Sequence, residues 1–435
     1  MPEFPAPHAS PLTPHAYLGL DFGTGGARAI VIDGDGVVLH QARRDFAEQS
    51  PAVWREALFE LLAAIPPELR RNLRAVAIDG TSSTVLLCDA GGEPLLPPLL
   101  YNDSRATKEA RELEAAAPAG HAVLSASSSL AKLQWLSKQP GAGRARYLMH
   151  QADWLAFQLH GRAGISDYHN ALKLGCDPAT LDYPDWLLRL PVRPLLPRIV
   201  EPGEAIGAVT SEIARRFALP PDCAIRAGTT DSIAAFIAAG ASRPGEAVTS
   251  LGSTLVLKLL SESRVDAAQY GVYSHRFGDL WLAGGASNSG GAVLRQFFGD
   301  GQLEALSARI DPTIASGLDY YPLPKPGERF PVNDPDLPPR LSPRPQDDVA
   351  FLHGLLEGMA RIEARGYQLL QQLGASRLHS LVTAGGGARN PAWTAIRARL
   401  LGVPVRPAAH ADAAYGAARL ARYGEKLLYS CQGEG

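Results

Sequence analysis

Two short segments combine small residues and hydroxyl groups in an order that suits phosphate binding, and the first of them also contains a carboxylate. In the first, "YLGLDFGTGGARAIVIDGDGVVL" (residues 17–39), Asp21 closes an apolar run, and Gly23, Thr24 and Gly25 precede a second apolar run. This pattern predicts a β-hairpin with a tight tip, where uncovered backbone N–H groups and a threonine hydroxyl form a small anion-binding concavity. A plain hairpin turn explains a lone example of the pattern equally well.

The second segment, "AVTSLGSTLVLKLL", repeats this design in the second half of the chain. Gly252 and Ser253 take the places of Gly23 and Thr24, and Thr254 follows them. Two such hairpins, each beginning one half of the chain, predict a duplicated domain with a cleft between the copies. Tips that face each other could bind the phosphates of one nucleotide.

A further carboxylate, Asp231, stands in "RAGTTDSIAAFIAAGA", at the start of a helix of small residues. One interpretation is that Asp231 caps this helix. The other is that the start of the helix carries a functional carboxylate over the cleft. The residues leave both interpretations open.

Near the end of the chain, "SLVTAGGGARNPAW" leads from a strand through three glycines into a helix. Gly386 and Gly387 would let the backbone approach a flat ligand, and Asn390 and Trp393 could contact a base. An ordinary glycine-rich turn between a strand and a helix is the alternative.

Several better-known motifs are missing from the sequence. Arg28 stands where the dinucleotide-binding fingerprint requires its third glycine, and no Gly-Lys dipeptide exists for a Walker A loop. The H-R-D and V-A-I-K signatures of protein kinases are also missing. The histidines lack metal-ligand spacing and the serines lack a nucleophile elbow, so neither a metalloenzyme nor a serine hydrolase is expected.

Bulk properties set wider limits. A chain of 435 residues exceeds one ordinary core and predicts two domains. A net charge of −2 without long runs of like charge argues against binding to nucleic acid or an anionic membrane. The four scattered cysteines indicate reduced thiols. Residues 1–16 lack the features of a signal peptide and are expected to form a disordered tail, so a cytoplasmic protein is expected.

Strands and helices alternate along the chain, which predicts an α/β fold. Strands are expected at Tyr17–Phe22, Ala27–Asp33, Gly36–His40, Arg74–Asp79, Thr84–Asp89, Cys223–Ala227, Ala247–Ser250, Thr254–Leu260 and Leu381–Ala384. Helices are expected at Pro51–Ile65, Ser104–Ala116, Leu130–Ser137, Ala152–Leu159, Ser232–Ala241, Ser289–Phe298, Asp348–Leu373, Trp393–Leu401 and Ala411–Tyr423. Residues 322–345 contain nine prolines and are expected to form an irregular loop.

Eight ordered segments resemble the FGGY carbohydrate kinases over nearly the whole chain. They are "GLDFGTGGARAIVID", "AIDGTSSTVLLCD", "PLLYNDSRA", "DWLAFQLHG", "AGTTDSIAAFIAAG", "SLGSTLVLK", "GER" and "TAGGGARN". "DFGTGGARA", "DGTSST" and "SDYHNALKLGCD" are most similar to the compact D-ribulose kinases of cyanobacteria and plants, which are also described as xylulose-kinase-like. The resemblance implies two ribonuclease-H-like (actin-like ATPase) domains with a nucleotide and sugar cleft between them. The expected parts are a tail at 1–16, a sugar-binding domain at 17–227, a nucleotide-binding domain at 228–425 and a tail at 426–435.

The resemblance also implies roles for the residues of the first hairpin and of the Gly-x-x-Asp segment. Asp231 matches the catalytic base. Asp21 matches a carboxylate that contacts the substrate and helps to place Mg²⁺, directly or through water. Gly23, Thr24 and Gly25 match the tip that meets the transferred phosphate.

The sugar-binding positions depart from the family pattern. Ser82 or its neighbour Ser83 stands where the larger xylulokinases have a Gln-Met-His-Gly segment, which weakens the case for xylulose. Asp103 and Arg105 match the Trp-x-Asp-x-Arg segment, with Tyr101 in place of the tryptophan.

In the second half of the chain, the resemblance assigns the remaining nucleotide contacts. Gly252, Ser253 and Thr254 match the second phosphate-binding hairpin. The adenosine site matches Gly386, Gly387, Asn390 and Trp393.

The expected activity is the ATP-dependent and Mg²⁺-dependent phosphorylation of a ketopentose, with D-ribulose giving D-ribulose 5-phosphate. D-Xylulose or a polyol is the alternative acceptor. A different class, an actin-like ATPase switch without a small acceptor, would share the hairpins but not the segments between them. The expected partners are the sugar and ATP, with no nucleic acid and no membrane, in a monomer or a homodimer.

Overall fold

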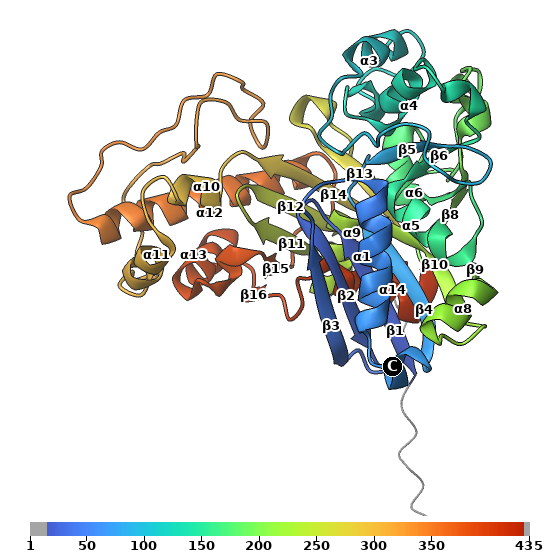
Figure 1. Cartoon of the computed structure of the whole chain (residues 1–435). Helices are drawn as coiled ribbons and strands as arrows, with labels where there is room; N and C mark the ends of the chain where they lie inside the picture. Colours follow the sequence, from blue (N-terminus) through green and yellow to red (C-terminus); the bar gives the residue numbers. More distant parts are fainter. Residues whose placement is uncertain (1–14, 430–435) are drawn as a thin grey trace, which may run out of the picture.

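Two six-stranded sheets form the body of the protein, and the computed structural model describes residues 15–429 of the chain (Figure 1). The expected tails therefore lie largely outside the described residues. At the ends of the described residues, Ala16 already belongs to the first strand, and a short 3₁₀ turn covers Gly424–Leu428.

The first sheet is mixed, and its three central strands are parallel. β1 pairs with β4, and β4 pairs with β10, in parallel register. Across the sheet the order is β3 (Val38–Asp45), β2 (Gly26–Ile32), β1 (Ala16–Phe22), β4 (Leu73–Gly80), β10 (Ala224–Thr230) and β9 (Ala205–Ala208).

Strand alternation explains how two different helices cover the two faces of this sheet. Leu18 and Leu20 are fully buried in one cluster with Trp54 of α1 (Pro51–Ala64). Gly19, between them, faces α14 (Ala413–Tyr423), where an added Cβ would lie 2.0 Å from the carbonyl oxygen of Ala414. The helix α14 can approach the sheet this closely only because that position has no side chain.

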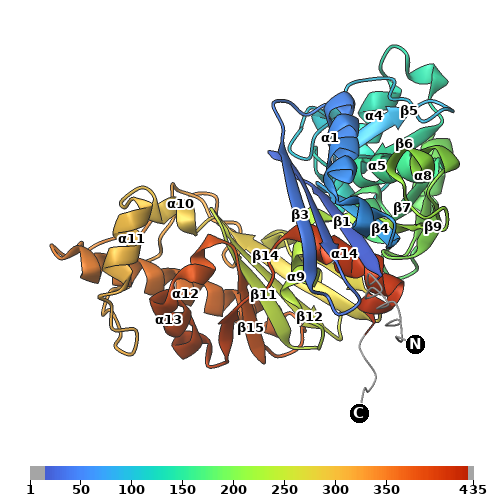
Figure 2. The same cartoon turned by 60° about the horizontal axis from the view of Figure 1, so that its bottom comes forward.

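The second sheet has the same hairpin-first organisation. Its order is β13 (Tyr273–Phe277), β14 (Leu280–Ser287), β12 (Leu255–Ser261), β11 (Glu246–Leu251), β15 (Ser380–Ala384) and β16 (Val405–Pro407). The helices α12 (Asp348–Gln372) and α13 (Pro391–Leu401) cover its outer face (Figure 2). Each half of the chain therefore begins its sheet with an antiparallel hairpin, as the sequence predicts.

The helix α9 (Asp231–Ala239) lies between the two sheets. Ile233 and Phe236 are buried in one cluster with Ala77 of the first sheet and Val248 of the second. Since α9 packs against both sheets, its first turn lies where the two halves of the chain meet.

A smaller region of short helices and strands sits above the first sheet, in teal and green in Figure 1. It contains α3 (Thr107–Leu113), α4 (Ser129–Ser137), β5 (Val85–Cys88), β6 (Tyr147–His150), α5 (Gln151–His160), β7 (Ile165–Asp167), α6 (Tyr168–Ala171), α7 (Asp185–Leu188) and β8 (Arg198–Val200). The remaining helices are α2 (Pro67–Arg70), α8 (Ser211–Phe217), α10 (Gly291–Leu294) and α11 (Asp300–Ser307).

Some expected elements differ from the observed ones. The β13–β14 hairpin was not predicted, although Gly278 followed by Asp279 is a two-residue hairpin signal. The helix expected at Ser289–Phe298 is only the single turn α10.

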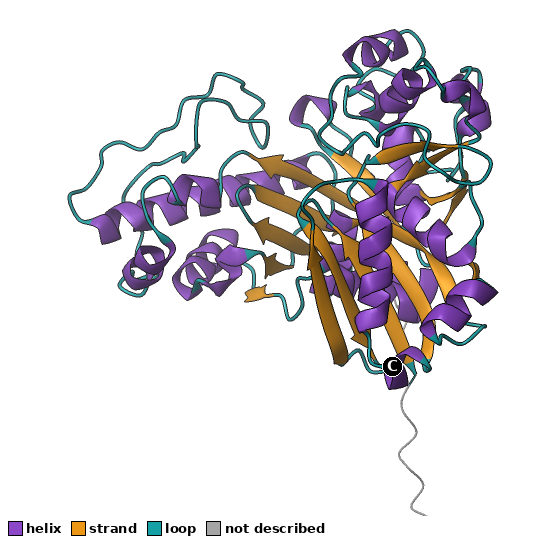
Figure 3. Ribbon diagram, in the orientation of Figure 1, coloured by secondary structure: helices purple, strands orange, loops and turns teal. Residues whose placement is uncertain are grey.

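Other expectations are confirmed. Ser50 caps α1 by accepting a hydrogen bond from the Val53 N–H group. Residues 322–345 form no helix or strand and belong to the long loop beside α12 (Figure 3). Between residues 15 and 429, no helix is long and apolar enough to cross a membrane.

Candidate functional site

Three carboxylates meet at one edge of the first sheet, because the parallel strands β1, β4 and β10 end there together. Asp21 is in register with Asp79, and Thr229 of β10 is also opposite Asp79. Asp231 begins α9, one residue after β10 ends. The charge of Asp231 contributes to the raised pKa of both Asp21 and Asp79, so the three carboxylates belong to one site.

Asp79 is the member of this group that sequence reasoning missed. Its side chain is fully buried, and neither of its oxygens has a hydrogen-bond partner in the described part of the chain other than the neighbouring carboxyl of Asp21. Burial and the charge of Asp21 raise the pKa of Asp79 well above its usual value, which favours the protonated form of Asp79. The signal for it was available, since "AIDG" ends a strand with a carboxylate and a glycine as "GLDFG" does.

Asp21 is less buried than Asp79 and ionises more easily. Burial raises its pKa to about 6, while the hydrogen bond from Asp79 opposes that rise. Within the pair, the hydrogen bond therefore runs from the Asp79 carboxyl to the Asp21 carboxylate.

Asp231 does not cap α9, so the capping interpretation is wrong. Thr230 is the N-cap residue, and its side chain makes no capping bond. The Asp231 carboxylate accepts a hydrogen bond of 2.6 Å from the backbone N–H of Ser232. Burial raises the pKa of Asp231, and the Ser232 bond and the charges of Lys258 and Lys173 oppose that rise.

The tip of the first hairpin is tight and open to solvent. The Gly23 N–H donates to the Gly26 carbonyl at 3.0 Å, and the Gln49 side chain donates to the Thr24 carbonyl at 2.5 Å. Thr24 and Gly25 are exposed. The tip therefore presents a hydroxyl and backbone groups to the space above Asp21.

The second hairpin tip lines a cavity of about 980 Å³ together with the glycine-rich turn after β15. Six of the seven residues predicted for this half of the nucleotide site line it; these are Gly252, Ser253, Gly386, Gly387, Asn390 and Trp393. Thr254 follows the tip but is not among the lining residues. Residues of α11, which sequence reasoning did not single out, form the opposite wall.

Within this cavity, Asn390 is already engaged by the protein. Its side-chain oxygen caps α13 by accepting from the Trp393 N–H at 2.9 Å, and its amide donates to Ser307 at 2.8 Å. Trp393 packs under Gly387, where an added Cβ would lie 2.7 Å from the indole ring. Both residues therefore shape the wall. A missed residue, Arg295, donates to the hydroxyl of Ser253 at 2.8 Å.

Ser82 and Ser83 form a turn at the start of the smaller region. Ser83 is buried with φ of +63°, and its hydroxyl has no partner in the described part of the chain. Lys132 donates to the carbonyls of Ser83 at 2.8 Å and Leu100 at 2.7 Å. This lysine joins the turn to the loop that carries Asp103, and burial lowers the pKa of Lys132 to about 7.

Asp103 and Arg105 form an ion pair with each other, with Nη2 of Arg105 2.8 Å from the carboxylate. Burial alone would raise the pKa of Asp103, but the hydrogen bonds and charge of Arg105 outweigh it and lower the pKa. Arg105 is about half exposed, and its guanidinium also lies over the ring of Trp135.

His169 connects the two sheets beside the site. Its Nε2–H donates to the Arg276 carbonyl at 2.7 Å, so Nδ1 accepts from the hydroxyl of Thr229 at 2.8 Å. Burial lowers the pKa of His169 to about 3, so the ring stays neutral and holds this tautomer.

The residues of the site suit Mg²⁺ only when a bound nucleotide supplies further oxygen ligands. In residues 15–429, no group of three or more histidine, cysteine or carboxylate side chains could hold a metal by itself. The partly exposed carboxylate of Asp21 is one oxygen ligand, and Mg²⁺ commonly completes its shell with phosphate oxygens and water. The site therefore fits a metal that arrives with a nucleotide.

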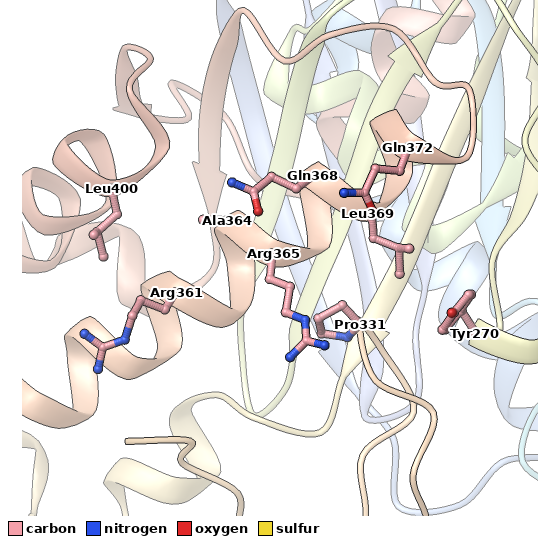
Figure 4. A pocket seen from close by; sticks show the side chains of 9 residues that line it. All are labelled: Tyr270, Pro331, Arg361, Ala364, Arg365, Gln368, Leu369, Gln372 and Leu400. Carbon is pink, nitrogen blue, oxygen red and sulfur yellow. The ribbon is translucent and has the colours of Figure 1, made fainter. Parts of the chain in front are cut away.

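A second hollow, of about 640 Å³, lies along α12 and includes none of the predicted site residues. Figure 4 shows its lining side chains, with Arg361 and Arg365 one turn apart on the helix. Arg361 is already bound to Glu357 and to the Leu318 carbonyl.

Comparison with known proteins covers almost the whole chain. The model of the N-terminal domain of the FGGY family of carbohydrate kinases matches residues 16–238, and the model of the C-terminal domain matches residues 247–425. A xylulose kinase from Streptomyces coelicolor is 32% identical over 92% of this chain and 86% of its own length. A xylulose kinase from Escherichia coli is 26% identical over 93% and 89%.

Solved structures share the fold. The crystal structure of a "xyloylose kinase" from Brucella ovis matches with a TM-score of 0.83 and 28% identity, covering 95% of this chain and 91% of that one. A xylulose kinase from Rhodospirillum rubrum matches with a TM-score of 0.80 and 23% identity over 96% and 92% of the two chains.

Proposed function

The chain belongs to the FGGY family of carbohydrate kinases and is an ATP-dependent sugar phosphotransferase, and from that premise we propose that it phosphorylates a ketopentose, D-ribulose first, with Asp231 as general base. The observation that carries this proposal is the meeting of Asp21 and Asp231 at one edge of the first sheet. If Asp21 and Asp231 lay on opposite faces of the molecule, they could not act on the same phosphoryl group.

In phosphoryl transfer the protein chiefly aligns the attacking oxygen with the phosphorus and neutralises charge. A sugar hydroxyl is a weak nucleophile, so a carboxylate must accept its proton as the new bond forms. Asp231 suits this task because the Ser232 N–H donates to one of its oxygens at 2.6 Å. The other oxygen is left to accept the proton of the sugar hydroxyl.

The first hairpin and its carboxylates handle the phosphoryl group. Thr24 and the neighbouring glycines offer a hydroxyl and backbone N–H donors to the oxygens of the phosphoryl group. In a P-loop enzyme, a lysine would bind these oxygens. Kinases of this family use ATP, normally with Mg²⁺, which when bound offsets the charge of the β- and γ-phosphates. Asp21 would supply one oxygen ligand, and Asp79 would orient Asp21 by donating a hydrogen bond to it.

The nucleotide would occupy the cavity of about 980 Å³ at the second hairpin tip. Gly252 and Ser253 would meet its phosphates, and the turn at Gly386 and Gly387 would meet the adenosine. Because Asp231 follows β10 of the first sheet and the cavity lies at the hairpin tip of the second sheet, closure of the two sheets' domains would bring ATP to the sugar and exclude water.

The identity of the sugar rests on two observations that favour different ketopentoses. The turn at Ser82 and Ser83 replaces the Gln-Met-His-Gly segment of larger xylulokinases, which favours D-ribulose. The matched relatives from Streptomyces coelicolor and Escherichia coli are named xylulose kinases, which favours D-xylulose as the second candidate. Asp103 would lie near the sugar in either case, held in place by Arg105.

The test compares ADP release with D-ribulose, D-xylulose, L-ribulose and ribitol, and without any sugar. We expect D-ribulose to give the highest kcat/KM and the reaction without sugar to be slow. A higher kcat/KM for D-xylulose would move the assignment to that sugar, and hydrolysis that no sugar stimulates would refute the kinase proposal.

The role of Asp231 is tested separately. Asp231→Ala is expected to lower kcat by about 100-fold or more, since general bases contribute roughly that much. ATP binding, followed by calorimetry, should change little because the nucleotide cavity does not include Asp231. Turnover near that of the unchanged protein would remove Asp231 from the chemistry.

A further inference from the structure

Lys258 reaches from the second sheet to the first turn of α9, beside the proposed base. It lies on β12, opposite Val248 of β11 and Gly284 of β14. Its ammonium donates to the backbone carbonyl of Ser232 and, at 3.0 Å, to the hydroxyl of the same residue. Ser232 immediately follows Asp231.

This contact joins the two halves of the chain. Ser232 falls within the part matched by the N-terminal family model, residues 16–238, and Lys258 within the part matched by the C-terminal model, residues 247–425. The contact therefore fixes the start of α9 relative to the sheet that carries the second phosphate-binding hairpin.

The charges of Lys258 and Asp231 also affect each other. Lys258 lowers the pKa of Asp231, and Asp231 raises that of Lys258, although burial brings the pKa of Lys258 down to about 8. Lys173, in the 3₁₀ turn Leu172–Leu174, is the other cation that acts on Asp231. No hydrogen bond of Lys173 to residues 15–429 is seen, whereas Lys258 is bonded to the residue next to the base.

A purely structural role is the competing explanation, and Lys132 provides the comparison. Lys132 is fully buried and donates to backbone carbonyls of two loops, as a structural lysine does. Lys258 and Ser232 are instead accessible to solvent at the start of α9. A partly exposed lysine at that point, beside the proposed base, can affect the chemistry as well as the fold.

We propose that Lys258 is a positioning residue for Asp231, fixing the first turn of α9 through Ser232 and keeping a positive charge beside the carboxylate. The inference rests on the proposed role of Asp231 as general base. In the reaction the proton passes from the sugar hydroxyl to Asp231, and Lys258 neither gains nor loses one.

The experiment uses three variants of the full chain. Lys258→Met keeps most of the apolar stem but removes the ammonium, Lys258→Gln keeps a donor without the charge, and Lys258→Arg keeps the charge. Lys138→Met is the matched control, because Lys138 pairs with Glu109 and Glu112 away from the site.

We expect Lys258→Met to lower kcat by about tenfold or more. A misplaced general base should lose part of its contribution to the rate, which is roughly 100-fold or more in full. The KM for ATP should change less than kcat, Lys258→Arg should restore most of the rate, and Lys138→Met should match the unchanged protein. The acid limb of the kcat–pH profile should move to higher pH in Lys258→Met and Lys258→Gln. The charged or titratable groups that face Asp231 are Lys258, Lys173, Asp21 and Asp79, and only the first is altered.

Two results would overturn the inference. One is a kcat of Lys258→Met within twofold of the unchanged protein. The other is a loss of rate that Lys258→Arg does not restore, with an unmoved acid limb and a lowered thermal midpoint, which would indicate a structural role. If Lys258→Met does not fold, Lys258→Gln decides by the same criteria.

Asp231→Ala, measured in parallel, separates this inference from the proposed function. An active Asp231→Ala variant would refute the base itself. An inactive Asp231→Ala variant beside a fully active Lys258→Met variant would refute only the role of Lys258.

Discussion

Replacing Asp21 by asparagine should make the protein more stable at neutral pH while it removes activity. The carboxyl of Asp21 sits beside Asp79 and within the field of Asp231, and burial raises its pKa to about 6. A carboxylate in such a place opposes folding, because its charged form loses water and meets other negative charges. Asparagine has nearly the same shape, carries no charge and can still accept the hydrogen bond from Asp79.

The sign and size of the effect follow from the two pKa values of Asp21. Its pKa is higher in the folded chain, about 6, than its usual value of 3.8, so the folded state binds this proton more tightly. Proton binding by Asp21 therefore stabilises the folded state fully below pH 4, and this stabilisation is lost as the pH rises through 6. The loss amounts to about 3 kcal/mol at pH 7 and about 1.6 kcal/mol at pH 5. Because Asp21 is partly exposed, these values are upper limits.

The assay is the thermal midpoint of both proteins from pH 5 to pH 8, with calorimetric enthalpies to convert midpoints into free energies. Asp21→Asn should be more stable than the unchanged protein, and its advantage should grow with pH up to about 7. Asp222→Asn, which alters an exposed carboxylate paired with Arg74 at 3.7 Å, should follow the unchanged protein throughout. If the curves for Asp21→Asn and the unchanged protein run parallel from pH 5 to pH 8, Asp21 does not have the raised pKa that the argument requires.

Two further predictions concern the framework that holds the site. Gly416→Ala should lower the free energy of unfolding by about 1–3 kcal/mol in urea titrations, because its Cβ would lie 1.8 Å from the Ala234 carbonyl and force α14 away from α9. Gly143→Ala, with nothing within 4 Å, is the control, and an equal loss in both variants would contradict the packing argument. Arg397→Met should lower the free energy of unfolding by about 3–5 kcal/mol, because it leaves buried Glu363 without the two bonds of 2.6 and 2.7 Å that it now accepts. Combining it with Glu363→Leu should recover part of that loss, and a double variant less stable than Arg397→Met would show that the isolated charge is not the cause.

Much of the fold follows from local patterns. The two hairpins were predictable because apolar strands on either side of glycine-rich tips leave the chain few alternatives. The helix after Ser50 was predictable because a serine followed by proline is a strong start signal. The β13–β14 hairpin was missed because its glycines, including Gly284 and Gly285, weaken the strand signal.

The candidate site was only partly predictable. Asp21 and Asp231 stand beside glycines and hydroxyl residues that mark them in the sequence. Asp79 is also followed by a glycine, but that mark alone did not single it out, and Lys258 carries no mark at all. The importance of both depends on partners far away in the chain. Asp79 matters through its register with Asp21, and Lys258 through its contact with Ser232.

The sequence by itself determined the hairpin tips, the glycine-rich turns and the helices that follow them, since steric limits on a few neighbouring residues are enough to specify such structures. Only the tertiary structure decided which carboxylates meet, which of their pKa values rise and which lysine reaches the start of α9. Those properties depend on strand register and on the loss of water around each group, and both arise only when distant segments pack together.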